Sequence, residues 1–595
     1  MKHRREIDGL RTVAVLPVLL SHAGLSLFAG GFVGVDIFFV ISGYLITGII
    51  VSELDEQRFS ILRFYERRTR RLLPALFVVM AACLIAGWFL MSADAYQNLG
   101  QSVVATTLFS NNILLTITSG YWDMESQFKP LLHTWSLGVE EQYYIVVPLL
   151  LAGVHRYSRR HVPLAFAAIG VVSFALCLWS IRAHPVGNFY LLHTRAWELA
   201  AGGWAATIRS PESQRGSGTL SLLGLLMIAA AVFTLSEGSP SPSPAMLLPV
   251  AGTTLILLYC RAGLVHRLLS SAPMVGIGLI SYSTYLWHQP LFAFLRIASS
   301  NPPAIWQFVA LIPVALALAW VSWRFVERPF RSRSMRFRTI AAVLAPSAFA
   351  LLVLGAALHL RGGLPQRFDV APDADRPATY KAYNMRVLEM KVDRFPPGAR
   401  QRALVLGNST GRDFVNMIRE ANALPGYAIV YRDDLDLCEG QRLSAGKRAL
   451  VTAATLVVLV YDHKPRQTCD GRQLAGDPDL HGKIVFIGPK DFGTNLNPYA
   501  RLPLNERAAA RVQLSNQAFA ASRLYRAITP AGLYVDVIAA LSPDGRHMPI
   551  FDSQGRILSE DRVHVTRAGA RFVGARVFRQ PAWQQIIARD AERLD

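Results

Sequence analysis

Charged residues are scarce in this sequence of 595 residues. Asp, Glu, Lys and Arg make up 17% of the chain, whereas a soluble protein of average composition has about 25%. Apolar residues make up 52%, and the mean hydropathy is +0.29. So high an apolar fraction over this length excludes an intrinsically disordered chain and a single soluble domain. The composition indicates a polytopic membrane protein with room for several domains.

Acidic residues are also few, with 41 Asp and Glu against 61 Lys and Arg, for a net charge of +20 at pH 7. Such a basic excess can indicate nucleic-acid binding. In the first half, however, the basic residues gather in short loops between apolar runs, which the positive-inside rule explains. We therefore expect a lipid bilayer and no nucleic acid as a partner. The dispersed charge of the second half is typical of a solvated surface, or of one that attracts an acidic glycan or membrane.

Cysteine is rare, with five residues in the whole chain. Cys83, Cys177 and Cys260 lie in apolar runs and are typical of small core residues. Cys438 and Cys469 lie in the polar second half, where an oxidising compartment would allow them to pair. We expect no metal site and no bound cofactor.

Eleven apolar runs are candidates for spanning helices, each of which needs about 20 residues. They are roughly residues 11–28, 32–51, 74–91, 136–154, 163–181, 193–208, 219–236, 245–261, 274–295, 304–323 and 339–359. Residues 98–117 are interrupted by Asn, Gln and Thr, so we expect them to be interfacial or re-entrant. Loops rich in Lys and Arg alternate with loops that are poor in them. The positive-inside rule then places the N terminus in the cytoplasm and the C-terminal domain outside.

The first apolar run is not expected to be a cleavable signal peptide, because Asp8, Arg11 and His22 interrupt it. No internal repeat is recognisable. The proline-containing residues 361–400 are typical of a linker.

The pattern changes from about Arg402. Short apolar strands in RALVLGNS, TLVVLVYD and GKIVFIG alternate with helical stretches such as DFVNMIREAN. This alternation predicts a parallel α/β sheet whose functional groups lie at the carboxyl ends of its strands. The predicted organisation is a membrane domain at 1–335, a linking transmembrane helix at 336–360, a linker at 361–400 and an α/β domain at 401–595.

Burying an ionisable side chain in a membrane costs free energy, so each such residue in an apolar run is a candidate functional residue. Arg11 and His22 share the first run, roughly 16 Å apart along a helix. A neutral imidazole can take a proton from a hydroxyl or thiol, although His22 is equally compatible with a buried histidine bonded to a neighbouring helix. Glu140 and Glu141 lie near the outer end of a span. One of them can orient an imidazole, and a plain structural ion pair is the alternative.

Two further segments of the membrane half stand out. Residues 32–46 (FVGVDIFFVISGYLI) carry Asp36 among small residues, which favour close helix packing. Residues 281–288 (SYSTYLWH) have aromatic side chains typical of an interfacial belt. We interpret His288, at the end of this segment, as a packing or anchoring residue.

Together these strings resemble the acyltransferase-3 family of membrane acyltransferases. The resemblance rests on six motifs in the family's order, over roughly residues 5–333. They are the Arg11/His22 spacing, GFVGVDIFFVISGYLI, the RRxRRLLP pattern at Arg67–Pro74, HTWSLGVEEQYY, SYSTYLWHQP and ERPFR. The resemblance implies transfer of an acyl group, usually acetyl, from cytoplasmic acyl-CoA towards a carbohydrate outside. It also implies that His22 is catalytic and that Arg11 assists at the donor. The family has an acidic residue at this position, and the motif does not distinguish whether Glu140 or Glu141 corresponds to it.

A second site is predicted in the α/β domain. Ser409 follows the first strand, where a serine can be exposed and carry an acyl group. Asp561 stands three residues before His564 near the C terminus, and an Asp can orient a His that deprotonates a Ser. These segments resemble an SGNH-type (GDSL-like) hydrolase domain of the sort fused to acyltransferase-3 proteins. That resemblance implies Ser409 as nucleophile, His564 as base and Asp561 as its orienting group.

This second site departs from its family at one position. Asn408 stands where the usual G-D-S motif has an acidic residue, although Asp561 still supplies a triad carboxylate. Asn495 and Asn497 are both candidates for the donor that stabilises an oxyanion.

The predicted fold is a polytopic all-α membrane domain, with about ten transmembrane helices plus one linking helix, followed by an α/β SGNH-like three-layer domain. The predicted function is membrane O-acyl transfer, chiefly of acetyl from acetyl-CoA, in a bacterial inner membrane. The acceptor is a cell-surface glycan or its lipid-linked precursor: lipopolysaccharide O-antigen, another surface polysaccharide or peptidoglycan. The outer domain would then be periplasmic. A proton-coupled transporter with an accessory domain, and an acyltransferase whose outer domain only binds glycan, are the alternatives.

Overall fold

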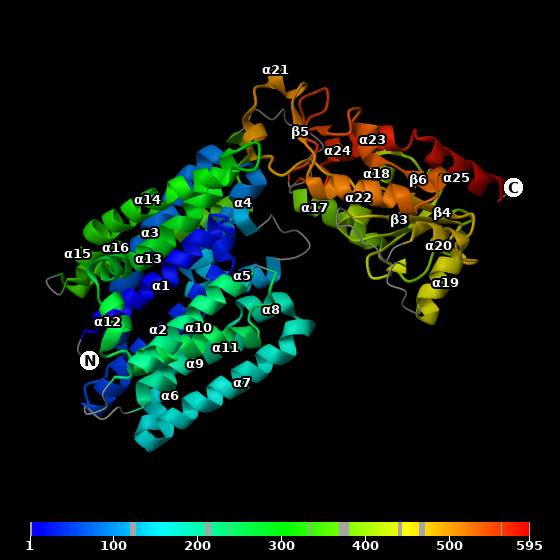
Figure 1. Cartoon of the computed structure of the whole chain (residues 1–595). Coiled ribbons are helices and arrows are strands. Elements are labelled where there is room, and N and C mark those ends of the chain that lie inside the picture. Colours follow the sequence, from blue (N-terminus) through cyan, green and yellow to red (C-terminus); the bar gives the residue numbers. More distant parts are fainter. Residues whose placement is uncertain are drawn as a thin grey trace. The chain divides into compact units, whose positions relative to one another are not determined.

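The computed structural model describes residues 3–118, 126–208, 216–236, 238–332, 335–367, 380–437, 443–462, 470–560 and 562–593. The chain forms two compact units (Figure 1). The first consists of Met1–Phe89, Tyr96–Arg296 and Pro303–Arg361, and the second of Leu90–Ala95, Ile297–Pro302 and Gly362–Asp595. The predicted core cysteines, Cys83, Cys177 and Cys260, are buried and unpaired as expected. The possible pair of Cys438 and Cys469 lies outside the described residues.

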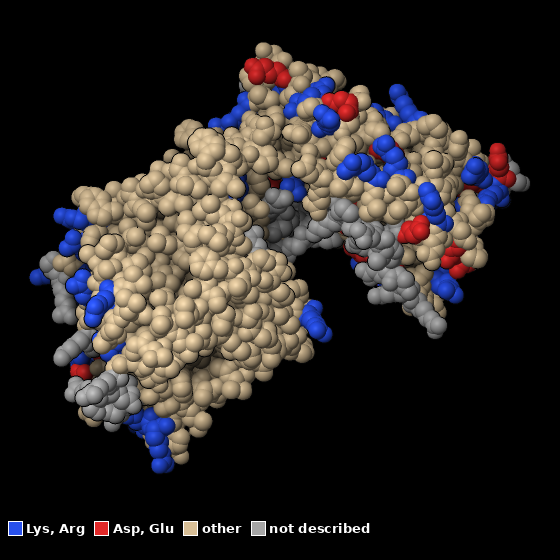
Figure 2. All heavy atoms as spheres, in the orientation of Figure 1, with Lys and Arg blue, Asp and Glu red and all other residues tan. Residues whose placement is uncertain are grey.

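The first unit is helical throughout its described part. Its helices are α1 (Arg5–His22), α2 (Gly34–Asp55), α3 (Ile61–Leu90), α4 (Ala93–Thr107), α5 (Asn111–Thr118), α6 (Trp135–Tyr157), α7 (Val162–Ala183), α8 (Pro185–Tyr190), α9 (Leu192–Thr207), α10 (Gly218–Thr234), α11 (Leu247–Tyr259), α12 (Gly263–Leu269), α13 (Ala272–Ala298), α14 (Ile305–Val321), α15 (Arg328–Arg331) and α16 (Phe337–Leu360). A 3₁₀ turn, η3 (Leu132–Thr134), precedes α6. On the face shown in Figure 2, uncharged residues cover most of this unit, and Lys and Arg gather mainly near the end that holds the N terminus, α12 and α15.

Within the described residues, six helical segments are long and apolar enough to cross a membrane, or seven if the bent pair α11 and α12 counts as one span. The sequence predicted eleven spans. The counts differ because helices such as α1 and α9 carry charged side chains and α10 has only 17 residues. The segment expected to be interfacial or re-entrant forms two short helices, α4 and α5, which are separated at Phe109 by a positive φ of 52°.

Glycines bring several helices of the first unit into backbone contact. A Cβ on Gly43 of α2 would lie 1.9 Å from the carbonyl oxygen of Leu199 in α9. A Cβ on Gly278 of α13 would lie 1.8 Å from the carbonyl oxygen of Asp8 in α1. No side chain fits such a distance, so glycine permits close helix packing at both positions, and Gly43 does so within residues 32–46, where it was predicted.

The second unit is built around a parallel sheet with strand order β2–β1–β3–β4–β6. Its strands are β1 (Arg402–Leu406), β2 (Ala428–Arg432), β3 (Leu456–Val460), β4 (Ile484–Ile487) and β6 (Tyr534–Val535), and β5 (Arg511–Gln513) pairs antiparallel with β7 (His547–Pro549). Its helices are α17 (Tyr380–Met385), α18 (Ser409–Ala421), α19 (Ala445–Ala453), α20 (Gly471–Gly476), α21 (Leu504–Arg507), α22 (Asn516–Ile528), α23 (Val537–Leu541), α24 (Arg567–Val577) and α25 (Pro581–Glu592). The predicted parallel α/β architecture is confirmed.

Alternate strand residues face opposite layers, as the twofold side-chain period of a strand requires. Ala403 and Val405 of β1 pack in one cluster with α18, α24 and α25. Leu404 and Leu406 pack in a second cluster with α19 and α22. The sheet is therefore covered by helices on both faces.

Part of the predicted linker packs against this sheet domain. Tyr383 of α17 and Val387, in the short helical turn that follows it, are buried in the same cluster as α18. The guanidinium of Arg386 donates hydrogen bonds to Asn416, at 2.8 Å, and to Glu420, at 2.9 Å. Residues 368–379 lie outside the described part of the chain.

Candidate functional site

His22 is the last residue of α1. The helix ends there because Ala23 caps it and Gly24 follows with a left-handed φ of 85°. Arg296 of α13 donates a hydrogen bond to the carbonyl oxygen of His22 at 3.2 Å. A cation at the carboxyl end of a helix is favourable, so this contact anchors the backbone that carries the imidazole.

Three histidines from distant parts of the sequence meet at this point. The Nδ1 of His22 lies 3.1 Å from the Nε2 of His288 in α13. The ring of His133 in η3 lies edge-on to that of His288, with 5.4 Å between the centroids. The Tyr285 hydroxyl donates to the His133 carbonyl at 2.9 Å and lies 2.8 Å from the hydroxyl of Ser136. His288, interpreted from the sequence as a packing residue, contacts the predicted catalytic histidine, and its place in the SYSTYLWHQP motif was the only signal of this.

A cavity of about 270 Å³ lies among α1, α2, α3, α6 and α13. Arg11, Arg68 and Arg71 are among the described residues that line it, together with Glu140. Tyr285, which packs against His288, is part of the same lining. Arginines therefore outnumber acidic residues in the lining, and one of the wall residues also contacts the histidines.

The two adjacent glutamates have different surroundings. Glu140 lines the cavity and accepts a hydrogen bond from Ser42 at 3.0 Å. Glu141 accepts one from Arg68 at 2.8 Å in a buried ion pair. Glu140 therefore faces the cavity, whereas Glu141 holds Arg68 in place. The sequence alone does not distinguish these two adjacent glutamates.

Arg11 also belongs to the cavity rather than to the histidine cluster. Its Nη1 lies 3.2 Å from a carboxylate oxygen of Asp8, one helical turn earlier in α1. Arg11 and His22 therefore mark two different places on one helix, as their spacing predicted.

A buried charge group lies behind one wall of this cavity. Arg195 of α9 donates to Asp36 at 2.9 Å and to Glu198 at 2.7 Å, and all three side chains are buried. The guanidinium also lies over the ring of Phe39, a cavity residue, at 5.7 Å. Asp36 is thus a member of a buried ion cluster. Arg195 and Glu198 were not singled out in the sequence, although two charges three residues apart in an apolar run were the available signal.

Ser409, the predicted nucleophile of the second unit, is the first residue of α18, directly after β1. Asn408 caps this helix: its Oδ1 accepts from the Thr410 backbone N–H at 3.0 Å. Its Nδ2 donates to a carboxylate oxygen of Asp462, beyond β3, at 3.1 Å. The serine therefore lies at the carboxyl end of a central strand, as expected, with 8% of its surface exposed.

A cavity of about 80 Å³ lies at the ends of β1, β2 and β3, and Gly407 and Asn408, the two residues before Ser409, are part of its lining. Asp433 and Asp462 contribute to it as well. Tyr461 and Tyr525 also line it, with stacked rings whose centroids are 3.9 Å apart. Burial raises the pKa of Tyr461 to about 12, so this hydroxyl stays protonated at neutral pH.

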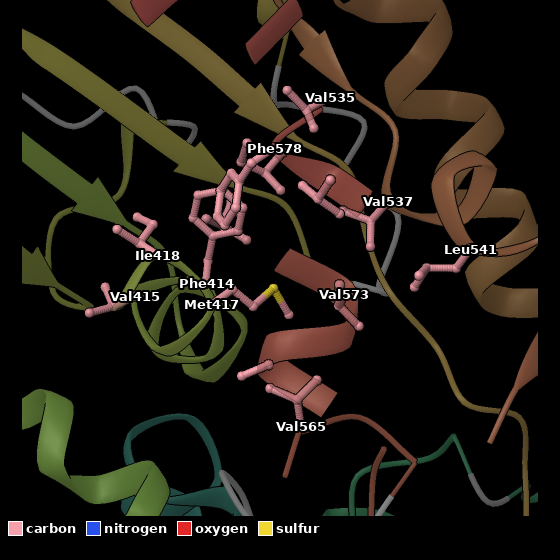
Figure 3. Close-up of a cluster of buried hydrophobic side chains, with 14 of the residues drawn as sticks. Phe414, Val415, Met417, Ile418, Val535, Val537, Leu541, Val565, Val573 and Phe578 are labelled. Carbon is pink, nitrogen blue, oxygen red and sulfur yellow. The ribbon is translucent and has the colours of Figure 1, made fainter. Parts of the chain in front are cut away.

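His564 is buried three residues before α24, and Thr566 caps that helix through its side chain. Helices α18 and α24 pack together, and Figure 3 shows the apolar side chains between them, including Phe414 beside Phe578. Asp561 lies outside the described residues. The triad of Ser409, His564 and Asp561 therefore stays a prediction.

The two oxyanion candidates bond to each other. The Oδ1 of Asn495 accepts from the backbone and side-chain N–H groups of Asn497, at 3.0 and 2.8 Å. Asn495 donates its amide hydrogens to the carbonyls of Ile297 and Ser299, at 2.9 and 2.8 Å. The carbonyl of the Asn497 side chain accepts from the Ser92 N–H at 2.8 Å. Their role as oxyanion donors stays a prediction.

Known proteins resemble the membrane half of the chain. The family model described as "Acyltransferase domain" matches residues 4–324. The peptidoglycan O-acetyltransferase OatA of Listeria monocytogenes is 31% identical over 353 residues, which are 56% of each chain. The putative peptidoglycan O-acetyltransferase YrhL of Bacillus subtilis is 29% identical over 360 residues, again 56% of each. The O-acetyltransferase OatA of Staphylococcus aureus is 27% identical over 348 residues, 56% of this chain and 57% of that one.

The chain spans somewhat more than half the length of the curated relatives it matches. No solved structure matches it. The family match covers more than half of the sequence and includes the helices that carry the cavity and the histidine cluster. The chain therefore belongs to the acyltransferase domain family, the one that its six motifs indicated.

Proposed function

We propose that this protein is a membrane O-acetyltransferase that takes acetyl from acetyl-CoA and delivers it to a hydroxyl of a cell-surface glycan. Peptidoglycan is the first acceptor to test, because two of the relatives are named for it. The observation that carries the proposal is the arginine-lined cavity, one wall of which contacts the histidine cluster, in a chain of an acyltransferase family.

The arginines of the cavity suit a donor with several phosphates. Arg11, Arg68 and Arg71 outnumber Glu140 in the lining. Guanidinium groups bind phosphates through paired hydrogen bonds, and acyl-CoA carries phosphates at one end and its thioester at the other. In this proposal the arginines hold the phosphates, and the thioester points towards Tyr285 and the histidines.

His22 then acts as general base. Its imidazole accepts the proton of the attacking hydroxyl as the oxygen forms a bond to the thioester carbonyl carbon. The carbon–sulfur bond breaks, and the proton passes to the departing CoA thiolate. The products are an acyl ester and free CoA, and His22 returns to its neutral form.

The outer domain completes the proposed path. The Ser409 hydroxyl attacks the carbonyl carbon of that first ester, with His564 as base and Asp561 as its orienting group, and the first acceptor leaves as a free hydroxyl with the proton that His564 took up. A glycan hydroxyl then attacks the Ser409 ester in the same way, which forms the glycan acetyl ester and restores the Ser409 hydroxyl. Asn495 or Asn497 supplies an oxyanion donor. This path places the enzyme in a bacterial inner membrane, with a cytoplasmic N terminus and a periplasmic α/β domain of the SGNH type.

The test compares surface glycans from a deletion strain complemented with wild type, His22→Ala or Ser409→Ala, at matched protein levels. Mass spectrometry should show acetyl groups with wild type and none with either variant. If only His22→Ala abolishes glycan acetylation, the outer domain binds glycan without taking part in the transfer. If wild type adds acetyl to no glycan, the O-acetyltransferase proposal is wrong and a transporter becomes the better interpretation.

A further inference from the structure

We infer that His288 is a positioning residue that sets the tautomer of His22 and leaves the His22 Nε2 atom as the base. The inference rests on the proposed function for the role of His22 in catalysis. The tautomer itself follows from hydrogen-bonding geometry and from the burial of His288.

The first step concerns His288. Its Nδ1 lies 2.6 Å from the carbonyl oxygen of Tyr285. A carbonyl oxygen only accepts hydrogen bonds, so the Nδ1 of His288 carries the hydrogen. His288 is fully buried and is surrounded by the rings of Tyr285, Phe292 and His133. An imidazolium among these rings would be costly, so His288 is neutral and its Nε2 is an acceptor.

The second step passes this constraint to His22. Its Nδ1 lies 3.1 Å from the Nε2 of His288. Because that Nε2 is an acceptor, the Nδ1 of His22 must be the donor. The ring planes are inclined by only 24°, and the centroids are 5.2 Å apart. This separation is close to the N···N distance plus the two ring radii, so the rings meet edge to edge, with the N–H directed at the lone pair.

The consequence is that the Nε2 of His22 carries its basic lone pair. In a Ser-His-Asp triad a carboxylate holds the imidazole in the productive tautomer. Here the chain from the Tyr285 carbonyl through His288 to His22 has that role without a buried negative charge. Arg296, bonded to the His22 carbonyl, fixes the backbone at the same point.

A direct test is nitrogen NMR of the full-length protein, labelled with ¹⁵N-histidine, in lipid nanodiscs. The chain has 14 histidines, so the His22 signals are assigned by their loss in His22→Gln. We expect a neutral His22 with hydrogen on Nδ1 in the wild type. Hydrogen on Nε2 of His22 in the wild type would overturn the inference.

The kinetic test compares two replacements. His288→Gln keeps an oxygen acceptor near the position of Nε2, whereas His288→Leu has no acceptor. For acetyl transfer from acetyl-CoA we expect kcat to fall roughly 100-fold in His288→Leu, the size of a general-base effect, with the KM for acetyl-CoA nearly unchanged. His288→Gln should recover at least about tenfold of that loss. His155→Leu, at a histidine near the end of α6 whose Nε2 lies 2.9 Å from a carboxylate oxygen of Asp55, is the matched control and should keep the wild-type kcat.

The outcomes separate the two proposals. Wild-type kcat in His288→Leu, or an equal loss in both His288 variants, would overturn the positioning role while the proposed function stands. If the wild type transfers no acetyl group, the proposed function is wrong. The NMR result would still decide the tautomer of His22.

Discussion

At the scale of single residues, Asn408 shows how a departure from a family motif fits its surroundings. Its Nδ2 donates to Asp462 and its Oδ1 accepts from Thr410. Aspartate would keep the second bond and lose the first, because a carboxylate has no hydrogen to donate. The amide is therefore matched to a carboxylate across the ends of β1 and β3.

Asn408→Asp should lower the stability of the α/β unit. Two carboxylates would then lie about 3 Å apart, and both cannot be ionised without cost. We expect a loss of about 1–3 kcal/mol at pH 7. Pulse proteolysis of the full chain in urea measures it. The exposed Asn516, at the start of α22, is the control: Asn516→Asp should be neutral or slightly stabilising near a helix N-terminus. Equal midpoints for wild type and Asn408→Asp would contradict the proposed pairing.

Glu420 predicts how stability depends on pH. Burial raises its pKa, but hydrogen bonds from Arg386 and Arg567 outweigh burial, and the net pKa lies below its usual value. A group with a lowered native pKa stabilises the fold above its unfolded pKa, about 4.3 for Glu. That contribution is lost as the pH falls through the lowered native pKa.

Glu420→Gln should therefore cost about 2 kcal/mol at pH 7, and the difference from wild type should shrink as the pH falls below about 4. Urea midpoints from pulse proteolysis at several pH values measure this. Glu592→Gln, at the exposed end of α25, is the control and should track the wild type at every pH. A gap that stays constant down to the lowest pH would argue against charge as the cause.

At the scale of elements, the packing of α1 against α13 brings His22 and His288 into contact. Gly278 of α13 lies against the carbonyl oxygen of Asp8, so any side chain there must push the helices apart. The same two helices carry His22 and His288.

Gly278→Ala should thus lower both acetyl transfer and the melting temperature of the detergent-solubilised chain. Gly276 is a matched control on the same helix, because a Cβ there meets nothing within 4 Å. Gly276→Ala should leave both quantities near wild type or raise the melting temperature slightly, since alanine favours a helix by about 1 kcal/mol. Similar effects of the two substitutions would show that the helix contact is not what matters.

At the scale of the whole molecule, the basic loops predict the orientation in the membrane. An alkaline phosphatase fusion at residue 595 should be active, because the α/β unit is expected outside. A fusion after residue 160, within the basic stretch at 155–161, should be inactive. The reverse pattern would overturn the predicted topology and, with it, the proposed route of the acyl group.

Much of this architecture follows from local patterns. Apolar length and scarce charge predicted a helical membrane half, and short apolar runs alternating with helical stretches predicted the parallel sheet. Each of these patterns involves residues close together in the sequence, so it can be recognised without knowledge of the tertiary structure. The number of spans was harder to predict, because helices such as α1 and α9 carry charged residues. The sequence does not show which partners neutralise those charges inside the helical unit.

The sequence by itself determined the family, through six motifs in order, and marked His22 and Ser409 as places where chemistry is expected. Only the tertiary structure decided that His288 meets His22, that Glu140 rather than Glu141 faces the cavity, and that Asp36 pairs with Arg195. These pairings join residues up to 266 positions apart. The physical reason is that hydrogen bonds and ion pairs depend on distances of about 3 Å, which only the packing of the helices establishes.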